Sequence, residues 1–589
     1  MSATIRRSAN YKPTIWNDEY IQSLNSVYGG KKFLQRAEKL KSEVIALLEK
    51  TNDQFDQIEV VDVLQRLGIF YHFKEYVERF LKNIHILGWD NIDDLHATAL
   101  RFRLLRQHGY KISTEVFRNF MDETGNFKTT FCNDIKGLLS LYEASNLSME
   151  GEIILDAAKE FATHHLKQKL DQNNIINENI AEEIAHVLEL PFHFRMPRLE
   201  SRWFMDVYEK RQDMSPVMLE LAKLDFNIVQ TMYQDELKEL SRWYSETGLA
   251  EKLRFARDRL VECFLWTVGF TFEPRFRYCR IMSAKFAILF TFIDDIYDVY
   301  GTLDELELFT EVVERWGINA IEQLPDYMKI CFLALFNTVN EMAYDVLRDQ
   351  GFNIIPHSTY RMAELCKKYL VEAQWYYSGY KPSLNEFLNN GWVSSSGPLF
   401  IVNAYLCMTN PLKDKSLEDL QRQPDVFKWT SLVFRLADDL STSADEMNRG
   451  DNPKSIQCYM HDTGCSEEDS RSYIKNLISS TWKKINEDVL MNSEYSRDFI
   501  ETSMNFARTS QCMYQYGDGY GKPDRESKAR ILSLVIEPIQ LHKQSKEHSK
   551  VTCVDEAWAL ISVVQLLRPT PGICWTKKKS CTEMLWPKI

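Results

Sequence analysis

Three aspartates at the end of an apolar stretch suggest metal chemistry by their type and spacing. Asp294, Asp295 and Asp298 lie in the sequence FTFIDDIYDVYG, directly after an apolar run with helical spacing. In a helix, Asp294 and Asp298 lie one turn apart on one face, so both carboxylates can reach one ion. Burying three acids at the end of an apolar helix is costly unless ions compensate them. A solvated helix terminus is the alternative interpretation, and the pattern favours metal binding.

A second group of oxygen donors lies later in the chain. Asp438, Thr442 and Glu446, in RLADDLSTSADE, are spaced by four and four residues and would form one ridge of a helix. Their carboxylate and hydroxyl oxygens suit Mg²⁺ or Mn²⁺, which also keep water ligands and bind substrate phosphates. Taken alone, this ridge is better interpreted as an ordinary polar face. Together, the two ridges predict two walls of one cavity.

Basic residues lie close to both ridges in the sequence. Arg257 and Arg259 form the sequence RDR before an apolar run. Arg435 lies one helical turn before the second ridge, and Lys454 follows that ridge. Each of them, taken alone, is typical of a surface charge. Beside a multi-metal site they could bind a diphosphate, with each Arg as a planar fork and Lys as a point charge.

Helices are the elements that the sequence offers to position these residues. Apolar residues recur at spacings of three and four along almost the whole chain, whereas alternating, strand-like runs are scarce. One such stripe consists of Leu219, Leu221, Leu224, Ile228 and Met232. Gly is sparse, at 22 of 589 residues, which disfavours a turn-rich β-sandwich. The sequence therefore predicts an all-α fold with short connections.

The length of the chain indicates two or three domains, at about 100–200 residues each. Charge and proline interrupt two helical stretches near Arg211–Pro216, which predicts an N-terminal domain over residues 1–213 and a second domain over 214–542. Both acidic clusters lie in the second domain. The composition changes again in residues 543–589, and we expect this tail to be disordered or only loosely docked.

Composition excludes several classes of function. The net charge of −13 disfavours a nucleic-acid-binding protein. The 12 cysteines are too widely spaced for a zinc ribbon or a compact disulfide framework, so a reducing compartment fits best. The chain shows no apolar stretch of the length of a membrane span. Because no secretory or plastid-targeting signal is visible, the sequence predicts a cytoplasmic protein, or a plastid protein if it is a truncated precursor.

Four motifs resemble those of plant class I terpene synthases in their sequence, in their order along the chain and in their spacing. DDIYD at residues 294–298 fits the DDxxD motif, and DDLSTSADE at residues 438–446 fits the (N/D)D(L/I/V)x(S/T)xxxE motif. RDR lies 37 residues before Asp294, as the RxR motif does in that family. Arg6, Arg7 and Trp16 fit the RRx8W motif of plant monoterpene synthases and their relatives, which include isoprene and α-farnesene synthases. The resemblance covers residues 6 to about 540 and leaves out the tail.

The resemblance implies a carbon–oxygen lyase with two all-helical domains. The first is an α-barrel whose initial stretch covers the active site, and the second is a class I terpenoid synthase α-bundle. It also implies three Mg²⁺ ions, with Mn²⁺ as a substitute, and a monomer or weak homodimer that binds a prenyl diphosphate. Neither nucleic acid nor membrane insertion is expected.

The resemblance also assigns roles to individual residues. Two metal ions would be bound by Asp294 and Asp298, and the third by Asp438, Thr442 and Glu446. By the same resemblance, Asp295 would be a further metal ligand or would orient the site by hydrogen bonding. The diphosphate would be held by Arg257, Arg435 and Lys454. Arg259 would help to close the site.

Aromatic rings near the metals could stabilise a carbocation. Trp266 is the leading candidate, and Phe332, Tyr514 and Tyr520 are weaker ones because aromatic residues at helical spacing are usually plain core. The segment Asn390–Pro398 (NGWVSSSGP) predicts a break in a helix, and in the family this break lines the pocket. Tyr514 and Asp518 match positions proposed to assist the final deprotonation, for which the diphosphate itself is the alternative base.

The substrate remains open between two prenyl diphosphates. RRx8W is linked to geranyl diphosphate and favours a monoterpene synthase, with an acyclic product of the ocimene, linalool or myrcene type. A cytosolic sesquiterpene synthase that uses farnesyl diphosphate is the alternative. In isoprene synthases a smaller polar residue typically replaces the Tyr of the pair that corresponds to Gln515-Tyr516, which weakly disfavours that activity here. A chain-elongating synthase would show a second DDxxD motif, where this chain has Thr442 and Glu446 instead. A non-catalytic prenyl-diphosphate-binding protein is the alternative from another class.

Overall fold

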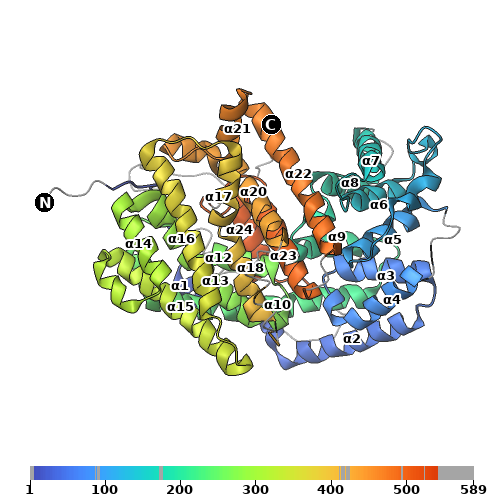
Figure 1. Cartoon of the computed structure of the whole chain (residues 1–589). Helices are drawn as coiled ribbons and strands as arrows, with labels where there is room; N and C mark the ends of the chain where they lie inside the picture. The colour runs from blue at the N-terminus through green and yellow to red at the C-terminus, as the bar shows by residue number, and fades with distance from the viewer. Residues whose placement is uncertain are drawn as a thin grey trace, which may run out of the picture. The chain divides into compact units, whose positions relative to one another are not determined.

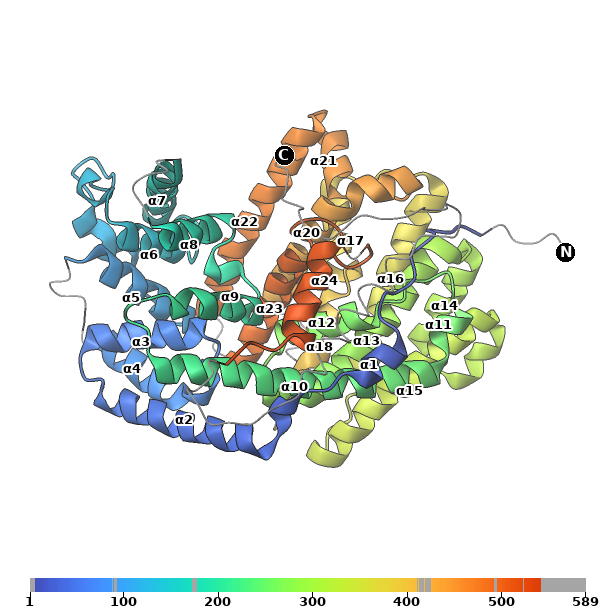
Figure 2. The same ribbon diagram turned by 180° about the vertical axis from the view of Figure 1, so that it is seen from behind.

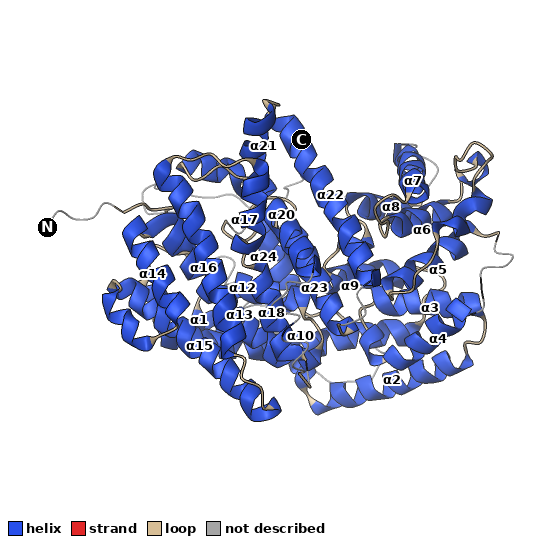
Figure 3. Cartoon of the chain, in the orientation of Figure 1, coloured by secondary structure: helices blue, strands red, loops and turns tan. Residues whose placement is uncertain are grey.

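Helices make up nearly all the secondary structure in the computed structural model (Figure 3). It describes residues 6–86, 88, 93–171, 177–409, 411–412, 418, 425–491, 495–522 and 524–541. Among these residues there is no β-strand, and one isolated antiparallel bridge joins Met121 and Phe127. The predicted all-α fold is confirmed. The tail predicted at residues 543–589 lies outside the described residues.

The N-terminal half is built from helices that pack mostly on their neighbours in sequence, above all α5 on α6 and α6 on α7 (Figure 1). Its α-helices are α1 Asp18–Ser23, α2 Lys31–Lys50, α3 Gln54–Arg66, α4 Lys74–Ile86, α5 Leu95–Gln107, α6 Ile135–Ser145, α7 Ile153–Asp171, α8 Glu178–Glu189 and α9 Pro197–Glu209. Short 3₁₀ turns join them at η1 Val27–Gly29, η2 Phe70–His72, η3 Thr114–Phe120, η4 Thr129–Phe131 and η5 Phe192–Phe194.

The C-terminal half contains the longer helices (Figure 1). They are α10 Pro216–Thr247, α11 Leu249–Lys252, α12 Leu260–Phe270, α13 Arg277–Asp295, α14 Leu303–Arg315, α15 Asp326–Gln350, α16 Ile355–Ser378, α17 Leu384–Ser394, α18 Gly397–Met408, α20 Asp425–Arg449, α21 Ser455–Thr463, α22 Glu467–Met491, α23 Arg497–Met513 and α24 Arg525–Ile531. Shorter turns are η6 Pro274–Phe276, η7 Ile296–Tyr300, η8 Ile318–Gln323 and η9 Leu532–Ile536.

The predicted interruption at Arg211–Pro216 is the point where α9 gives way to α10. Ser215 caps α10, and Pro216 occupies its first turn, where a missing N–H costs nothing. The helix runs for 32 residues and packs against α1 and α2 as well as α12 and α13 (Figure 2). It therefore joins both halves within the compact unit Met1–Gln540, and the domain limit at 213/214 stays a prediction.

Five helices surround the region that carries the motifs. α12 packs against α13 and α23, and α18 packs against α13 and α20. All 11 residues of α12 are buried, so this helix runs through the core. α20 is amphipathic and packs its apolar side on α22 and α23. The polar ridge of α20 lines the same cavity as the end of α13.

α15 is the one helix in the described part of the chain that is long and apolar enough to cross a membrane by length and composition. This differs from the expectation that no stretch of that length exists, because scattered polar residues interrupt the run without much lowering its mean hydropathy. In its most apolar window, 44% of the residues are buried inside the protein. The helix packs against α13 and α16, as a core helix does.

Candidate active site

A cavity of about 120 Å³ lies among α12, α13, α18, α20 and α23. Residues of both acidic clusters line it, so the structure brings the two predicted walls together. Aromatic side chains line the same cavity from α12 and α23. A larger cavity of about 590 Å³ lies elsewhere, between α4 and α23, and contains neither cluster.

The first wall is formed by Asp294 and Asp298. α13 ends at Asp295, and the chain continues as the π-helical turn Ile296–Tyr300, which carries Asp298. The spacing of the aspartates predicts a regular helix here, whereas the chain forms a π-helical turn, a feature that occurs frequently at functional sites. Asp295 is 0% exposed and does not line the cavity. It accepts hydrogen bonds from the backbone N–H and the Nε of Arg257, at 2.7 and 3.2 Å, and so positions that arginine.

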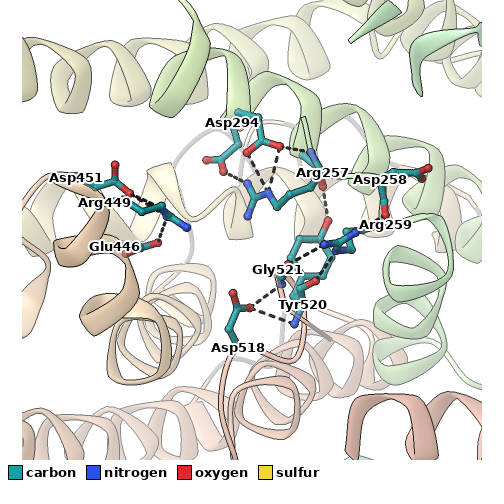
Figure 4. Close-up of polar contacts among 12 residues, drawn as sticks. Arg257, Asp258, Arg259, Asp294, Glu446, Arg449, Asp451, Asp518, Tyr520 and Gly521 are labelled. Atoms are coloured by element: carbon teal, nitrogen blue, oxygen red, sulfur yellow. Dashed lines mark hydrogen bonds and ion pairs between the residues drawn. The ribbon is translucent and has the colours of Figure 1, made fainter. Parts of the chain in front are cut away.

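The second wall is one ridge of α20, formed by Asp438, Thr442 and Glu446. Arg435, one turn earlier, pairs with Asp438 and donates from Nε to Asp439 at 2.8 Å. On the first wall, Arg257 pairs with Asp294 in the same manner (Figure 4). Each wall therefore places a guanidinium group directly beside its carboxylates.

Carboxyl groups are crowded together in this part of the cavity. Burial, together with neighbouring carboxylates, raises the pKa of Asp298 well above its ordinary value. Burial also raises the pKa of Asp438 to about 7, against the opposing effect of Arg435. At Glu446, burial alone would raise the pKa, but the positive charges of Lys454 and Arg435 outweigh this effect, so the pKa of that carboxyl is lowered. Lys454 Nζ lies 3.5 Å from Glu446 Oε2.

The donor atoms fit hard divalent cations. Glu446 Oε2 is buried without a hydrogen-bond partner, which suits an oxygen that ligates a metal. No group of three or more His, Cys, Asp and Glu side chains within the described residues is already gathered for a metal ion. Carboxylate and hydroxyl oxygens are donors that Mg²⁺ accepts, and Mg²⁺ keeps several water ligands and binds substrate phosphates. The Thr442 hydroxyl adds an oxygen donor between Asp438 and Glu446.

Aromatic rings line the same cavity as the carboxylates. Trp266 packs on Phe434 with 5.0 Å between ring centroids, and Phe434 stacks on Tyr514 at 6.1 Å. Phe290 and Phe400 meet edge to face at 5.1 Å. All five line the cavity. The electron-rich faces of such rings attract cations.

The N-terminal stretch lies against the acidic end of the cavity. Arg6 donates to both carboxylate oxygens of Glu305, at 2.8 Å each. Arg7 donates to the carbonyl of Asp298 at 2.7 Å and pairs with Asp451. Trp16 is buried, at 7% exposure, and fixes the far end of this stretch. The RRx8W residues thus attach the N-terminus to the helices that carry the first wall.

Arg259 is not among the residues that line the cavity. Its guanidinium group donates to four backbone carbonyls: those of Asp258 at 2.7 Å, Tyr520 at 3.0 Å and Gly521 at 2.8 Å (Figure 4), and that of Lys12 at 3.2 Å. Asp518 accepts the N–H groups of Tyr520 and Gly521 at 3.2 and 2.6 Å. Arg259 therefore joins the N-terminal stretch to the loop after α23, which is a positioning role.

The helix break predicted at Asn390–Pro398 is present. α17 ends at Ser394 and α18 begins at Gly397, with Ser396 between them at a φ of 62°. The serines at 394–396 line the cavity. A Cβ at Gly397 would lie 2.4 Å from the Oγ of Ser431, so only glycine fits against α20 here.

Several residues that line the cavity are not among those predicted from the sequence. Glu372 on α16 accepts hydrogen bonds from Asn390 at 2.9 Å and from Ser394, and it lines the cavity. A single acid on an amphipathic helix carries no motif that could have revealed it. Tyr11 lies between the arginines and the tryptophan of the RRx8W motif, so that motif could have indicated it as a site residue. Arg449, which lies 2.9 Å from Asp451 and 3.8 Å from Glu446, follows the second ridge directly (Figure 4).

One aromatic candidate was wrong. Phe332 on α15 is absent from the cavity and packs against Trp316 and Phe336, with centroids 5.7 and 6.0 Å apart. Helical spacing does not tell which face of a buried helix meets a cavity. The other predicted aromatic residues, together with Asp518, do line it: Trp266, Tyr514 and Tyr520. Arg257 does so as well, from the loop before α12.

Two family profiles match this chain. Residues 15–188 match the terpene synthase N-terminal domain, and residues 245–484 match the metal-binding domain of the terpene synthase family. The (+)-epi-alpha-bisabolol synthase of Phyla dulcis is 66% identical over 547 residues, which cover 92% of this chain and 100% of that protein. The (-)-alpha-terpineol synthase of Vitis vinifera is 55% identical and covers 91% of each chain.

A solved structure agrees with these matches. The isoprene synthase of grey poplar leaves (Populus x canescens), in complex with three Mg²⁺ ions and dimethylallyl-S-thiolodiphosphate, superposes with a TM-score of 0.82. It is 45% identical and covers 90% of this chain and 99% of its own. The likeness thus extends over both halves of the fold and both acidic walls. The chain belongs to the terpene synthase family, as a magnesium-dependent lyase that acts on a prenyl diphosphate.

Proposed function

We propose that this chain ionises geranyl diphosphate to an allylic cation and releases diphosphate and a C10 monoterpene. The observation that carries the proposal is a single cavity lined both by the oxygen donors of the two walls and by a group of packed aromatic rings. Three magnesium ions, held between the two acidic walls, would supply Lewis-acid neutralisation of the leaving diphosphate. Mn²⁺, which prefers the same oxygen donors, would replace Mg²⁺.

The chain's own cations would bind the diphosphate. Arg257 and Arg435 lie beside the two walls, and Lys454 lies beside the second. Both guanidinium groups have a raised pKa, because nearby carboxylates outweigh the effect of burial, so they stay charged. A planar fork can donate two parallel hydrogen bonds to phosphate oxygens, which would fix the orientation of the leaving group.

The aromatic rings of the cavity would stabilise the cation after ionisation. Each well-placed ring face contributes about 0.5–2 kcal/mol to binding a cation. Burial and the nearby carboxylates of Asp438 and Asp518 raise the pKa of Tyr514 well above its ordinary value. The Tyr514 phenol therefore stays protonated, and we assign its ring, rather than a phenolate, to the reaction. Asp518 is engaged with backbone N–H groups, which leaves the released diphosphate as the better base for the final deprotonation.

Exclusion of water completes the proposed mechanism. The stretch from Arg6 to Trp16 covers the acidic end of the cavity, and Arg259 ties it to the loop after α23. A closed cavity protects a carbocation from early capture by water. The RRx8W residues would therefore act by keeping this cover in place.

The relationship to an α-terpineol synthase, whose product is a C10 alcohol, supports geranyl diphosphate as the substrate. An acyclic product of the ocimene, linalool or myrcene type stays part of the proposal.

One observation favours farnesyl diphosphate as a second candidate substrate. Bisabolol is a C15 alcohol, and the epi-alpha-bisabolol synthase of Phyla dulcis matches over its full length at 66% identity. In that case the enzyme would be a sesquiterpene synthase of the cytoplasm, the location that the sequence predicts.

A competition experiment tests the choice of substrate. Purified enzyme with Mg²⁺ receives equal concentrations of geranyl and farnesyl diphosphate in one vessel, and products are measured by gas chromatography and mass spectrometry. We expect C10 products in at least tenfold excess over C15 products. An excess of C15 products would overturn the proposal in favour of the second candidate. Size-exclusion chromatography with light scattering in the same preparation would test the predicted monomer or weak homodimer.

A further inference from the structure

The cavity of about 590 Å³ lies where helices of the N-terminal half meet helices of the C-terminal half. Residues of α3, α4 and α5 line it together with residues of α22 and α23, and we call it the interface cavity. Ligand sites in proteins commonly measure about 300–1,000 Å³. Among the residues that the structure describes, none lines both this cavity and the active-site cavity. The interface cavity is therefore a separate place in the molecule.

Both halves contribute apolar side chains to the interface cavity. Val77 and Leu81 belong to α4, Phe270 ends α12, and Met504 lies on α23. All four residues are buried. A ligand that packs its apolar surface against them removes that surface from water, which is the main driving force for binding such molecules. The lining thus suits a largely apolar molecule.

Ion pairs neutralise charge within the lining. Lys74 Nζ lies 2.8 Å from Asp498 Oδ1, and Arg508 lies 2.6 Å from Glu501 Oε1. Arg497 is exposed to solvent and donates to a backbone carbonyl at 2.6 Å. Because the charges inside the cavity are compensated by one another, the lining favours a neutral ligand over an ion.

His193 offers a hydrogen-bond acceptor to such a ligand. The Nδ2 group of Asn486 donates to the carbonyls of Asn146 and Ser148, at 3.1 and 3.0 Å, and this fixes the orientation of its amide. Asn486 Oδ1 lies 2.8 Å from His193 Nε2, so Nε2 carries the proton and donates it. His193 Nδ1 is then an acceptor, and it is buried without a hydrogen-bond partner. His193 is 1% exposed and lines the cavity.

Two further observations point to a ligand that donates a hydrogen bond. Burial lowers the pKa of His193 to about 3, so its ring is neutral at neutral pH and Nδ1 keeps its lone pair. Gln65, which also lines the cavity, has its Nε2 2.8 Å from His108 Nε2, and its Oε1 is buried without a partner. A buried acceptor that lacks a donor is costly, and a hydroxyl group would satisfy it.

We propose that the interface cavity binds a small, neutral and largely apolar alcohol, whose hydroxyl group donates to His193 Nδ1. The apolar body of the alcohol packs against the side chains that α4, α12 and α23 contribute. The same hydroxyl oxygen can accept a hydrogen bond from water or from the lining. Binding at this site does not depend on which prenyl diphosphate the enzyme uses.

The test is isothermal titration calorimetry of the full chain, without Mg²⁺ or substrate, with α-terpineol and with limonene. Limonene has the same carbon skeleton and lacks the hydroxyl group. We expect the alcohol to bind about tenfold more tightly, which is the effect of one buried hydrogen bond. In His193→Phe, which keeps a ring but loses the acceptor, this preference should fall below about threefold, while limonene binds as it does to the wild type.

A second variant locates the site. Leu490 on α22 lines the cavity and is partly exposed, so Leu490→Trp can fill the cavity without burying a larger side chain in the core. We expect it to weaken the binding of α-terpineol by about tenfold or more. Leu347→Trp is the matched control, because Leu347 on α15 is 50% exposed and does not line the cavity. It should bind α-terpineol as the wild type does.

Three results would overturn the proposal. If α-terpineol does not bind up to its limit of solubility, water alone satisfies the acceptors. If α-terpineol and limonene bind equally to the wild type, the cavity does not recognise a hydroxyl group. If Leu490→Trp leaves the binding unchanged, the alcohol binds elsewhere, for example in the active site. Should His193→Phe fail to fold, the comparison of the two ligands in the wild type and the Leu490→Trp result still decide the question.

Discussion

Arg6→Ala is expected to loosen the cover of the active site. Arg6 donates two parallel hydrogen bonds of 2.8 Å to Glu305 and one of 3.0 Å to the carbonyl of Tyr300. Its guanidinium carbon also lies 4.5 Å from the centroid of the Tyr300 ring. The side chains of Arg6 and Glu305 are each 21% exposed, so solvent screens part of their attraction.

The magnitude follows from these contacts. A hydrogen bond to a charged group contributes about 1.5–3 kcal/mol when it is buried, whereas exposed ion pairs contribute about 0–1 kcal/mol. For a partly exposed, bidentate pair we take about 1.5 kcal/mol from between these limits, and the ring contact adds about 0.5 kcal/mol. The sum of about 2 kcal/mol corresponds to about a 30-fold shift in the attachment of the N-terminal stretch. We expect kcat/KM to fall by about 10- to 30-fold and alcohol products to increase as water reaches the cation.

The assay combines product analysis with hydrogen–deuterium exchange over residues 7–16. Arg6→Lys keeps the charge but loses the fork, and it should show an intermediate loss. Arg348→Ala is the matched control, because it removes an ion pair with Asp349 whose side chains are 52% and 57% exposed. If Arg6→Ala keeps kcat/KM within twofold of the wild type and exchange over residues 7–16 is unchanged, the reasoning is refuted.

Three further predictions follow from other parts of the molecule. Trp266→Leu should lower the single-turnover rate by about fivefold, because a ring face stabilises a cation by about 1 kcal/mol, whereas substrate affinity should stay within twofold of the wild type. An unchanged rate would show that the Trp266 ring does not stabilise the cation. Gly269→Ala should lower the free energy of unfolding by about 1–3 kcal/mol, because a Cβ there would lie 2.4 Å from Thr509 Oγ1; urea titration measures it, and a stability equal to the wild type would show that α12 and α23 can separate freely. Burial lowers the pKa of His193 to about 3, so the unfolded chain binds a proton below about pH 6.5 that the folded chain does not. The buried neutral imidazole therefore costs no stability above that pH, and it destabilises the fold progressively as the pH falls below it. The loss of free energy of unfolding between pH 7 and 5.5 should be about 1 kcal/mol smaller in His193→Gln than in the wild type. Equal losses in both proteins would contradict this prediction.

The second acidic wall illustrates what could be predicted from sequence. Asp438, Thr442 and Glu446 lie on a regular helix, so their spacing alone placed them on one ridge. The break near Asn390–Pro398 was also predictable, because glycine and proline act locally on the backbone. The all-α fold followed from apolar periodicity over the whole chain. In each case the signal is local, because it depends on the spacing of residues within a few turns of the chain.

Features that depend on tertiary packing could not be predicted in this way. The π-helical turn that carries Asp298 has no signature in the sequence DDIYD. Glu372 reaches the cavity because α16 happens to pack beside it, and a lone acid gives no sign of this. Phe332 points into a different aromatic cluster for the same reason. Asp295 resembled its neighbours in sequence, yet it is turned towards Arg257 and away from the cavity.

The central claim is that the two acidic walls hold the divalent ions that trigger ionisation. Its most direct test is the release of inorganic diphosphate from geranyl diphosphate by wild type and Asp298→Asn, each with Mg²⁺ or with a chelator. We predict rapid release by the wild type only with Mg²⁺, and a loss of at least 100-fold in the variant with its fold intact by circular dichroism. Equal release by the two proteins, or release that is unaffected by the chelator, would contradict the account.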